Sequence, residues 1–293
     1  PILNTTTTYY VDATDNSCTS STRTPVTLNV QKTVVPTAPI NQSFCDIDNA
    51  IISDLSITGS NILWYQDDVS TVPLDSGELL SNKTYYATQS INGCESPLRL
   101  PVNVIIYETV TPPNSLNIPI IETCDSLQNG SDTNGFSAFD LTLNEAILLN
   151  GKSASNFSFF YFTDSVYSLL INNPSSFINT IPYTQPIYVR IENNLDSSCF
   201  IDTSFDIIVN ALPTIESSIV FKNCDEDVIP DGFTDVNLNE ANDVISNNNS
   251  TGLDFTYYLS DNESLLGQNS INSNSYNNLN GNTVYGRVEN NNG

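Results

Sequence analysis

Acidic side chains gather in two loops, each of which begins at a Cys-Asp pair. The loops read "CDSLQNGSDTNGFSAFD" and "CDEDVIPDGFTD". Their carboxylates belong to Asp125, Asp132 and Asp140 in the first loop and to Asp225, Asp227, Asp231 and Asp235 in the second. Calcium takes six to eight oxygen ligands, and Asp-rich turns that contain glycine supply carboxylates and carbonyls in close succession. Both loops are therefore candidate calcium sites, and calcium is the only cofactor that the sequence suggests.

A simpler interpretation of the same loops remains open. Asp and Asn side chains also hydrogen-bond to nearby backbone in solvated turns that hold no ion. The spacing does not match an EF-hand, because no Glu stands at the twelfth position after Asp225. A shorter "CDID" segment, with Asp46 and Asp48, is a weaker version of the same pattern.

The six cysteines stand singly and far apart, at positions 18, 45, 94, 124, 199 and 224. None forms a Cys-X-X-Cys motif, which argues against zinc ribbons and redox centres. Wide spacing in a chain rich in Tyr, Asn and Thr favours one disulfide per domain in an oxidising compartment. The alternative is buried free thiols in a cytosolic protein.

No residue pattern supports catalysis, so we predict that the chain is not an enzyme. The sequence contains no His, which removes the commonest general base and zinc ligand. Asp67 and Asp68 are adjacent, and adjacent residues on a strand point to opposite faces, so this pair cannot straddle a sugar. With 8 Lys and Arg against 33 Asp and Glu, the net charge is 8 − 33 = −25. Such a surface disfavours nucleic acid and anionic membranes as partners and favours divalent cations.

Internal repeats define the domain organisation. "TYYVDATDNSCTSSTRTPVTLNV" at 8–30 resembles "TYYATQSINGCESPLRLPVNV" at 84–104, and "FDLTLNEA" at 139–146 resembles "TDVNLNEA" at 234–241. Proline-bearing joints separate the units. We predict the C-terminal remnant of one repeat at 1–34, a complete repeat at 35–110, a longer repeat at 111–213, and a repeat lacking its last strands at 214–293.

Each complete repeat holds two cysteines, so we predict the disulfides Cys45–Cys94 and Cys124–Cys199. Each would add about 2–4 kcal/mol by restricting the unfolded chain. Cys18 and Cys224 are expected to have lost their partners because the chain begins and ends within a repeat. Apolar runs are too short to span a bilayer, so no direct membrane insertion is expected.

The local pattern predicts strands throughout. Short runs rich in Val, Ile, Tyr, Phe and Thr alternate apolar and polar residues and are separated by Asn-Gly and Asp-Gly turns. Cys94 should lie at a hairpin, Trp64 in a core, and Tyr85 and Tyr86 on opposite faces of a strand. Residues 141–151, "LTLNEAILLNG", are expected to form a helical turn or two. The predicted fold is all-β, with tandem immunoglobulin-like β-sandwich repeats in an elongated array.

Two sets of motifs resemble the immunoglobulin-like repeats of large secreted proteins of Bacteroidota. The first is "TYYA…NGCES" with Trp64-Tyr65, and the second is the pair of runs "CD…FDLTLNEA…IYVRIENN…C" and "CD…DGF…TDVNLNEA…YY…VYGRVENN". Such proteins include type IX secretion substrates and gliding-associated surface adhesins. The resemblance implies an extracellular, cell-surface location and neighbouring repeats of the same chain as partners. Antibody-type disulfide spacing does not hold, because Cys94 lies in a turn.

Two functions follow as hypotheses. The first is an adhesin-like structural stalk that holds a distal region away from the cell, with calcium and disulfides stiffening it. The alternative is a glycan-binding module, at an adhesin tip or beside a secreted enzyme, with surface glycans or other cells as partners. Lateral self-association through unpaired sheet edges is a further expectation. Ser126 and Ser165 follow Asp and precede apolar residues, which resembles the O-glycosylation pattern of Bacteroidota.

Overall fold

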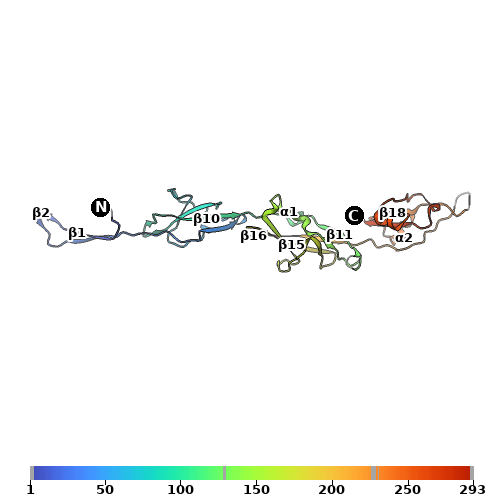
Figure 1. Ribbon diagram of the computed structural model, residues 1–293, viewed down its shortest axis with the longest axis horizontal. Coiled ribbons are helices and arrows are strands. Elements are labelled where there is room, and N and C mark those ends of the chain that lie inside the picture. Colours follow the sequence, from blue (N-terminus) through green and yellow to red (C-terminus); the bar gives the residue numbers. More distant parts are fainter. Residues whose placement is uncertain (1–2, 128–129, 226–228, 230, 291–293) are drawn as a thin grey trace. The chain divides into compact units, whose positions relative to one another are not determined.

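The structure is a computed structural model that describes residues 3–127, 130–225, 229 and 231–290. The chain forms two compact units. The first comprises residues 1–117, 145–161 and 189–203, and the second comprises residues 118–144, 162–188 and 204–293. The fold is all-β, built of several small sheets with short helical turns between them, as the strand pattern predicts (Figure 1).

The first unit begins with a β-hairpin. Strands β1 (Thr7–Val11) and β4 (Thr24–Leu28) pair antiparallel. Two shorter strands, β2 (Thr14–Asp15) and β3 (Cys18–Thr19), pair at its tip. Proline residues and a polar segment then lead to the next sheet.

A four-stranded sheet in the order β5-β10-β7-β6 follows in the same unit. The first strand pairs in parallel with the last, and the remaining pairs are antiparallel. Its elements are β5 (Asn41–Cys45), η1 (Asp46–Asp48), η2 (Ile52–Asp54), β6 (Leu63–Tyr65), β7 (Lys83–Thr88) and β10 (Leu100–Tyr107), with a small hairpin of β8 (Ser90–Ile91) and β9 (Cys94–Glu95).

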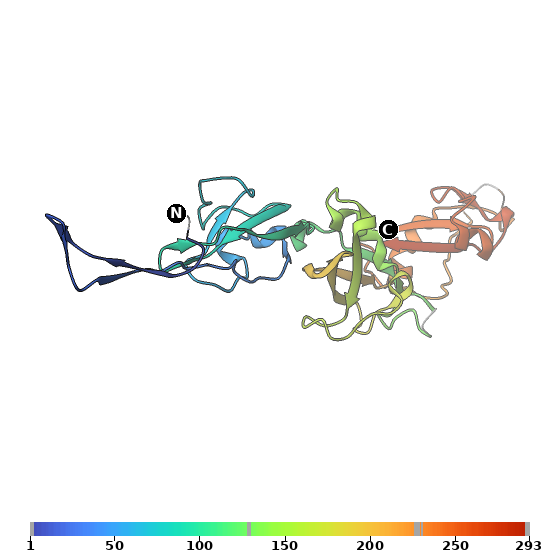
Figure 2. The same ribbon diagram turned by 60° about the vertical axis from the view of Figure 1, so that its left-hand side comes forward.

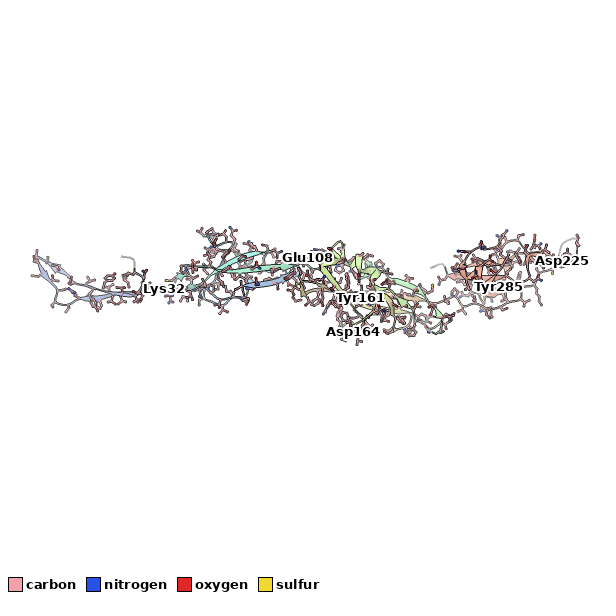
Figure 3. All side chains as sticks on the ribbon, viewed as in Figure 1. Lys32, Glu108, Tyr161, Asp164, Asp225 and Tyr285 are labelled. Atoms are coloured by element: carbon pink, nitrogen blue, oxygen red, sulfur yellow. A yellow bond between two sulfur atoms is a disulfide. The ribbon has the colours of Figure 1, made fainter. Side chains whose placement is uncertain are left out.

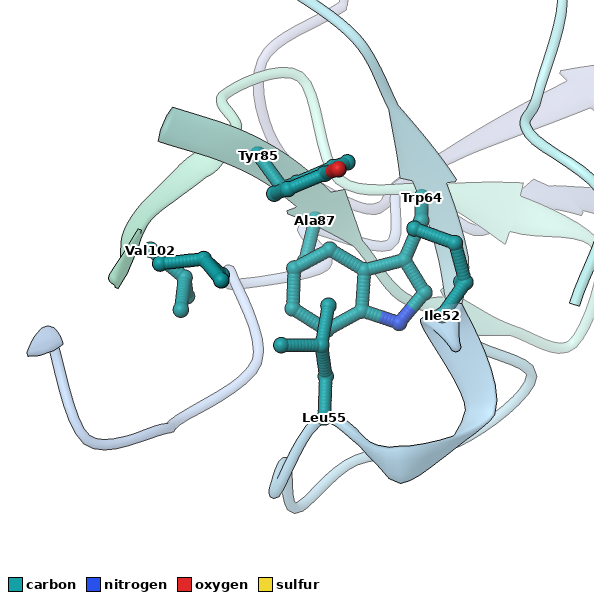
Figure 4. Packing of buried hydrophobic residues seen from close by; sticks show 7 residues of the cluster. Ile52, Leu55, Trp64, Tyr85, Ala87 and Val102 are labelled. Atoms are coloured by element: carbon teal, nitrogen blue, oxygen red, sulfur yellow. The ribbon is translucent and has the colours of Figure 1, made fainter. Parts of the chain in front are cut away.

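Trp64 lies at the centre of the core of this sheet (Figure 4). It packs with Ile52 and Leu55 from the η2 turn and with Tyr85 and Val102 from the sheet. Tyr85 is fully buried, whereas its neighbour Tyr86 is only partly buried, because successive strand residues face opposite sides. Both expectations for these aromatic residues are confirmed.

A second four-stranded sheet has the order β11-β16-β15-β13, and its long strands β15 and β16 contribute residues to both units. Again the first strand pairs in parallel with the last: Ile121 lies opposite Ile207 and Cys124 opposite Asn210. Along β15 every second side chain is buried, which is the pattern of a strand with one covered face. The strands are β11 (Ile121–Cys124), β13 (Phe157–Phe162), β15 (Thr184–Asn193) and β16 (Asp196–Asn210).

Short elements accompany this sheet. Strands β12 (Ala138–Phe139) and β14 (Phe177–Ile178) pair antiparallel. The helical turns are η3 (Ser115–Asn117), η5 (Leu141–Asn144), α1 (Glu145–Leu149), η6 (Ala154–Asn156) and η7 (Pro174–Ser176). The predicted helical segment at 141–151 is confirmed as η5 followed by α1, and it ends at Asn150 and Gly151, both with positive φ.

In the C-terminal part of the second unit (red in Figure 2), the described strands pair in two small antiparallel sheets. Its strands are β17 (Asp235–Val236), β18 (Leu253–Tyr258), β19 (Tyr276–Asn277) and β20 (Tyr285–Asn290), and its helical turns are η8 (Leu238–Ala241), α2 (Asn242–Ile245), α3 (Asp261–Leu266) and η9 (Asn278–Asn280). β17 pairs with β19 and β18 with β20. The core consists of Leu238, Ala241, Ile245, Tyr257 and Tyr276.

The four domain boundaries taken from the repeats stay predictions. Among the described residues, no helix is both long and apolar enough to cross a membrane.

Candidate functional site: a disulfide joint

A single disulfide bond links two distant segments of the first unit. Cys45, the last residue of β5, bonds to Cys199 in β16, with an S–S distance of 2.05 Å and a Cα–Cα distance of 5.4 Å. The two cysteines are 154 positions apart in the sequence. Cys199 is only 1% exposed, so the bond is largely shielded from solvent. It joins the predicted repeat at 35–110 to the predicted repeat at 111–213.

The predicted pair Cys45–Cys94 is wrong, and the sheet geometry explains why. Cys45 lies opposite Tyr107, at the end of β10, whereas Cys94 lies in the β8–β9 hairpin that precedes the beginning of β10 at Leu100. The length of β10, from Leu100 to Tyr107, separates these positions by about 23 Å. A disulfide needs Cα atoms within about 7 Å. The prediction that Cys94 lies at a hairpin is nevertheless confirmed.

The predicted pair Cys124–Cys199 is wrong for the same reason. Cys124 lies opposite Asn210, and Cys199 lies far back along the same strand β16. At about 3.3 Å per residue, the two are roughly 35 Å apart along the strand. In each four-stranded sheet the two cysteines lie near opposite ends, too far apart to bond to each other. A disulfide can form instead between a cysteine of one sheet and a cysteine of the next sheet, as in Cys45–Cys199. Cys18, Cys94 and Cys224 carry exposed thiols.

Polar contacts surround the disulfide on the side of β5. Asp46, directly after Cys45, accepts hydrogen bonds from the Thr109 backbone N–H at 2.9 Å and from its hydroxyl at 2.6 Å. The Ser43 hydroxyl donates to the Asp196 carboxylate at 3.0 Å. Hydrogen bonds from the Ser198 hydroxyl and N–H and from Ser43 hold the pKa of Asp196 below its ordinary value, although partial burial opposes them. The carboxylate of Asp46, in the "CDID" segment, thus holds Thr109, just before the chain passes into the next predicted repeat.

Glu108 is the hub of the joint (labelled in Figure 3). Its carboxylate accepts from Lys152 Nζ at 2.7 Å and from Asn156 Nδ2 at 3.0 Å, and its backbone carbonyl accepts from Asn193 Nδ2 at 2.9 Å. The hydrogen bond from Lys152, followed by that from Asn156, lowers the pKa of Glu108, and the same contact raises the pKa of Lys152. The linker is thereby tied to the turn after α1, to η6 and to β15 of the following repeat.

These contacts hold two successive predicted domains together through one covalent bond and a set of charge-assisted hydrogen bonds. Sequence reasoning did not find this site. Its members lie up to 154 positions apart, and no local motif links Glu108 to Lys152 or to Asn193. The acidic residue next to each first-strand cysteine was the only local signal.

The acidic loops use their first carboxylate to close the loop. Asp125, 3% exposed, accepts from the Gly135 N–H at 2.6 Å. Asp225 (labelled in Figure 3) accepts from the Gly232 N–H at 2.8 Å. Both glycines have a positive φ, which a side chain would strain. These are the contacts that the solvated-turn interpretation describes.

An asparagine holds the other side of each loop. Asn179 Oδ1 accepts from the Ser137 N–H at 2.7 Å, and its Nδ2 donates to the Gly135 carbonyl at 2.7 Å. In the second copy, Asn278 Oδ1 accepts from the Thr234 N–H at 2.8 Å. Each asparagine directly follows a short strand, β14 or β19, so each loop is tied to the end of the strand that pairs with β12 or β17.

The remaining predicted metal ligands point to separate partners. Asp140 accepts from Thr142, and Asp231 accepts from the Phe233 N–H. Asp235 lies in β17 and accepts from Asn277 Nδ2. Asp132 is partly buried, and Asp227 lies outside the described residues. Within the parts of the chain that the structure describes, no three such side chains gather into a group that would hold a metal, and calcium stays a prediction.

The two predicted glycosylation sites differ in exposure. Ser165 is exposed in the turn after β13, where the Asp164 carboxylate (labelled in Figure 3) accepts from the N–H groups of Ser168 and Leu169. Ser126 is partly buried, and its N–H donates to Asp125. Glycosylation of either residue stays a prediction.

The fold and the joint define a class: a protein of several all-β domains, in which a disulfide joins successive domains. A family model described as the Flavobacterium inter-domain disulphide bond domain matches residues 120–213 and again residues 220–293. The two matches cover more than half of the chain, and the chain belongs to this family. Cys199 lies in the first match and bonds to Cys45, which precedes it. No curated protein matches the chain.

Proposed function

We propose that this chain is a load-bearing spacer segment of a larger extracellular protein. The observation that carries the proposal is the position of the Cys45–Cys199 disulfide. Tension that enters at residue 35 travels along β5 to Cys45, crosses the disulfide to Cys199 and leaves along β16. The disulfide thus carries the tension past the residues that lie between the two cysteines in the sequence.

The hydrogen bonds of the joint support the same role. Asp46 holds Thr109, and the adjacent Glu108 holds Lys152 and Asn156, so the beginning of the linker is fastened to the domains on both sides of it. A bond in one domain alone would stabilise that domain but would not restrain the joint. The resemblance to gliding-associated adhesins supports attachment at a cell surface, with the spacer placing a binding region at a distance from it.

Stretching the single molecule from its two ends tests the proposal. The Cys45→Ser/Cys199→Ser double variant should reach a fully extended length roughly 500 Å greater than that of the oxidised chain, because the 154-residue loop is then released. A Cys18→Ser/Cys224→Ser variant, which changes two exposed thiols, should extend as far as the oxidised parent. If the oxidised parent extends as far as the first double variant, the load does not pass through the disulfide and the spacer role fails.

A further inference from the structure

Four Asn-Gly pairs lie wholly within the described residues, at positions 92–93, 134–135, 150–151 and 280–281. Such a pair can react without an enzyme, because glycine has no Cβ and its nitrogen can approach the Cγ of the preceding asparagine side chain. The new N–C bond closes a succinimide ring, and the side-chain nitrogen leaves as ammonia. Water then opens the ring to aspartate or isoaspartate, so the residue gains a negative charge and loses its amide donor.

Ring closure requires motion in both residues of the pair. The asparagine side chain must turn toward the following nitrogen, and the peptide plane that carries this nitrogen must rotate. Hydrogen bonds that fix either group must break first, and a bond broken in a buried site costs more than one that water can replace. The contacts of each pair therefore rank the rates at which the four pairs react.

The pair Asn134–Gly135 is held firmly by its neighbours. The Gly135 N–H, which carries the attacking nitrogen, donates to the Asp125 carboxylate at 2.6 Å, and the Gly135 carbonyl accepts from Asn179 Nδ2 at 2.7 Å. Asn134 Oδ1 accepts from the Phe136 N–H at 2.9 Å, which fixes the side chain that would be attacked. Gly135 is buried, so water cannot replace these bonds, and the pair is protected from ring closure.

The pair Asn280–Gly281 is held by fewer and longer bonds. The Gly281 N–H donates to the Asn278 carbonyl at 3.0 Å, and Asn280 Nδ2 donates to the Asn277 carbonyl at 3.2 Å. Asn280 is exposed and Gly281 is partly buried. We therefore expect partial protection at this pair.

The pairs at 92–93 and 150–151 are fully exposed, and their attacking nitrogens are free. Among the described residues, no group accepts a hydrogen bond from the N–H of Gly93 or Gly151. Apart from the adjoining residues, no atom lies within 4 Å of the position that a Cβ would take at either glycine. Ring closure at these two pairs therefore meets neither a backbone hydrogen bond nor a packed neighbour.

Each of the two exposed asparagines makes one side-chain contact that water can replace. Asn92 Nδ2 donates to Gln31 Oε1 at 3.3 Å, and Asn150 Nδ2 donates to the Thr111 carbonyl at 2.9 Å. Both acceptor residues are exposed.

We propose that Asn92 and Asn150 are sites of spontaneous deamidation, and that deamidation at Asn150 releases the linker at Thr111. Aspartate and isoaspartate have no N–H to give to the Thr111 carbonyl, and their carboxylate would face that carbonyl oxygen. The linker would then lose its tie to the turn after α1. This proposal concerns a modification of the chain and does not depend on the load-bearing role.

Incubation of the full oxidised chain in neutral buffer made with heavy-oxygen water tests the ranking. Opening of the succinimide ring incorporates the heavy oxygen, so peptide mapping by mass spectrometry measures the modified fraction at each pair and excludes deamidation that occurred earlier. The same chain unfolded in guanidinium is the reference, because the four pairs there lack their contacts and should react at similar rates.

In the folded chain we expect Asn92 and Asn150 to react at least about a hundredfold faster than Asn134, because each buried bond that must break slows ring closure by about tenfold. Asn280 should react at an intermediate rate. The proposal fails if Asn134 reacts as fast as Asn92 and Asn150, or if folding slows all four pairs alike.

Asn150→Asp tests the consequence at the joint. Hydrogen exchange of residues 107–112, followed by mass spectrometry, should be several-fold faster in this variant than in the parent. The matched control Asn92→Asp makes the same charge change in the other exposed pair and should leave exchange in this segment unchanged. Parent-like exchange of residues 107–112 in Asn150→Asp would overturn the release of the linker.

Discussion

At the scale of single residues, Asn179 and Asn278 hold equivalent loops with different degrees of burial. Asn179 is 3% exposed and makes three hydrogen bonds to backbone groups, to Ser137, Gly135 and Ile181. Asn278 is partly exposed. A buried backbone group that loses its partner costs more than one that water can reach.

We therefore expect Asn179→Ala to lower the free energy of unfolding by about 2–3 kcal/mol and Asn278→Ala by less than about 1 kcal/mol. Urea unfolding followed by circular dichroism measures both. Equal, small losses would show that Asn179 does not hold its loop.

The two copies of the repeat align differently in the structure than in the sequence. The sequences "FDLTLNEA" and "TDVNLNEA" align Leu143 with Leu238, but the structure aligns Leu141 with Leu238, since both are buried at the start of a helical turn. The tyrosine contacts agree: Tyr161 donates to Glu145 and Tyr257 to Asn242, the first residues of α1 and α2. Burial raises the pKa of Tyr257 to about 12. The alignment of the short sequence motifs is therefore shifted by two residues from the structural alignment.

At the scale of elements, the acidic loop before β17 carries the calcium prediction. If calcium binds there, millimolar calcium should raise the melting temperature by several degrees relative to excess chelator, because a ligand that binds only the native state stabilises it. Asp225→Asn/Asp231→Asn should remove the rise. A control with the exposed residues Asp68→Asn/Asp254→Asn should retain it, and a rise that persists in both variants would place calcium elsewhere.

The joint after β10 predicts sensitivity to acid. The pKa of Glu108 is lowered in the folded state by the hydrogen bond from Lys152 and then by that from Asn156. A lowered pKa contributes stability above the ordinary carboxylate pKa, and this stability is lost as the pH falls through the lowered value. Because the pair is partly exposed, the effect is expected to be small.

Unfolding midpoints measured between about pH 6 and pH 3 should fall less steeply in Glu108→Gln than in the parent. The control Glu78→Gln, an exposed residue away from the joint, should behave as the parent does. An unchanged pH dependence in Glu108→Gln would remove Glu108 from the acid-sensitive contacts.

At the scale of the whole molecule, the disulfide closes a loop far longer than either of the loops that a bond within one repeat would close. For a loop of 154 residues the chain-entropy model predicts a contribution of about 5 kcal/mol. Guanidinium unfolding of Cys45→Ala/Cys199→Ala should show a loss approaching this value, and reduction of the parent should give the same loss. A loss below about 1 kcal/mol would show that the bond restrains the joint without stabilising the fold.

The sequence by itself determined the strands, the hairpin at Cys94, the core position of Trp64 and the short helix after Leu141. These features depend on alternation of apolar residues, on turn pairs and on positive-φ glycines and asparagines, all of which act within a few residues. The all-β class could be read from the same local signals, and the resemblance to secreted Bacteroidota proteins agrees in its broad part with the Flavobacterium family match.

Only the tertiary structure decided which cysteines meet. The sequence favoured a disulfide between the two cysteines of one repeat. In the structure, the parallel pairing of β5 with β10 places Cys45 at one end of the sheet, whereas Cys94 lies at the other end. Cys45 therefore meets Cys199 of the following repeat. Strand direction and register set the distance between thiols, and sequence spacing does not contain that distance.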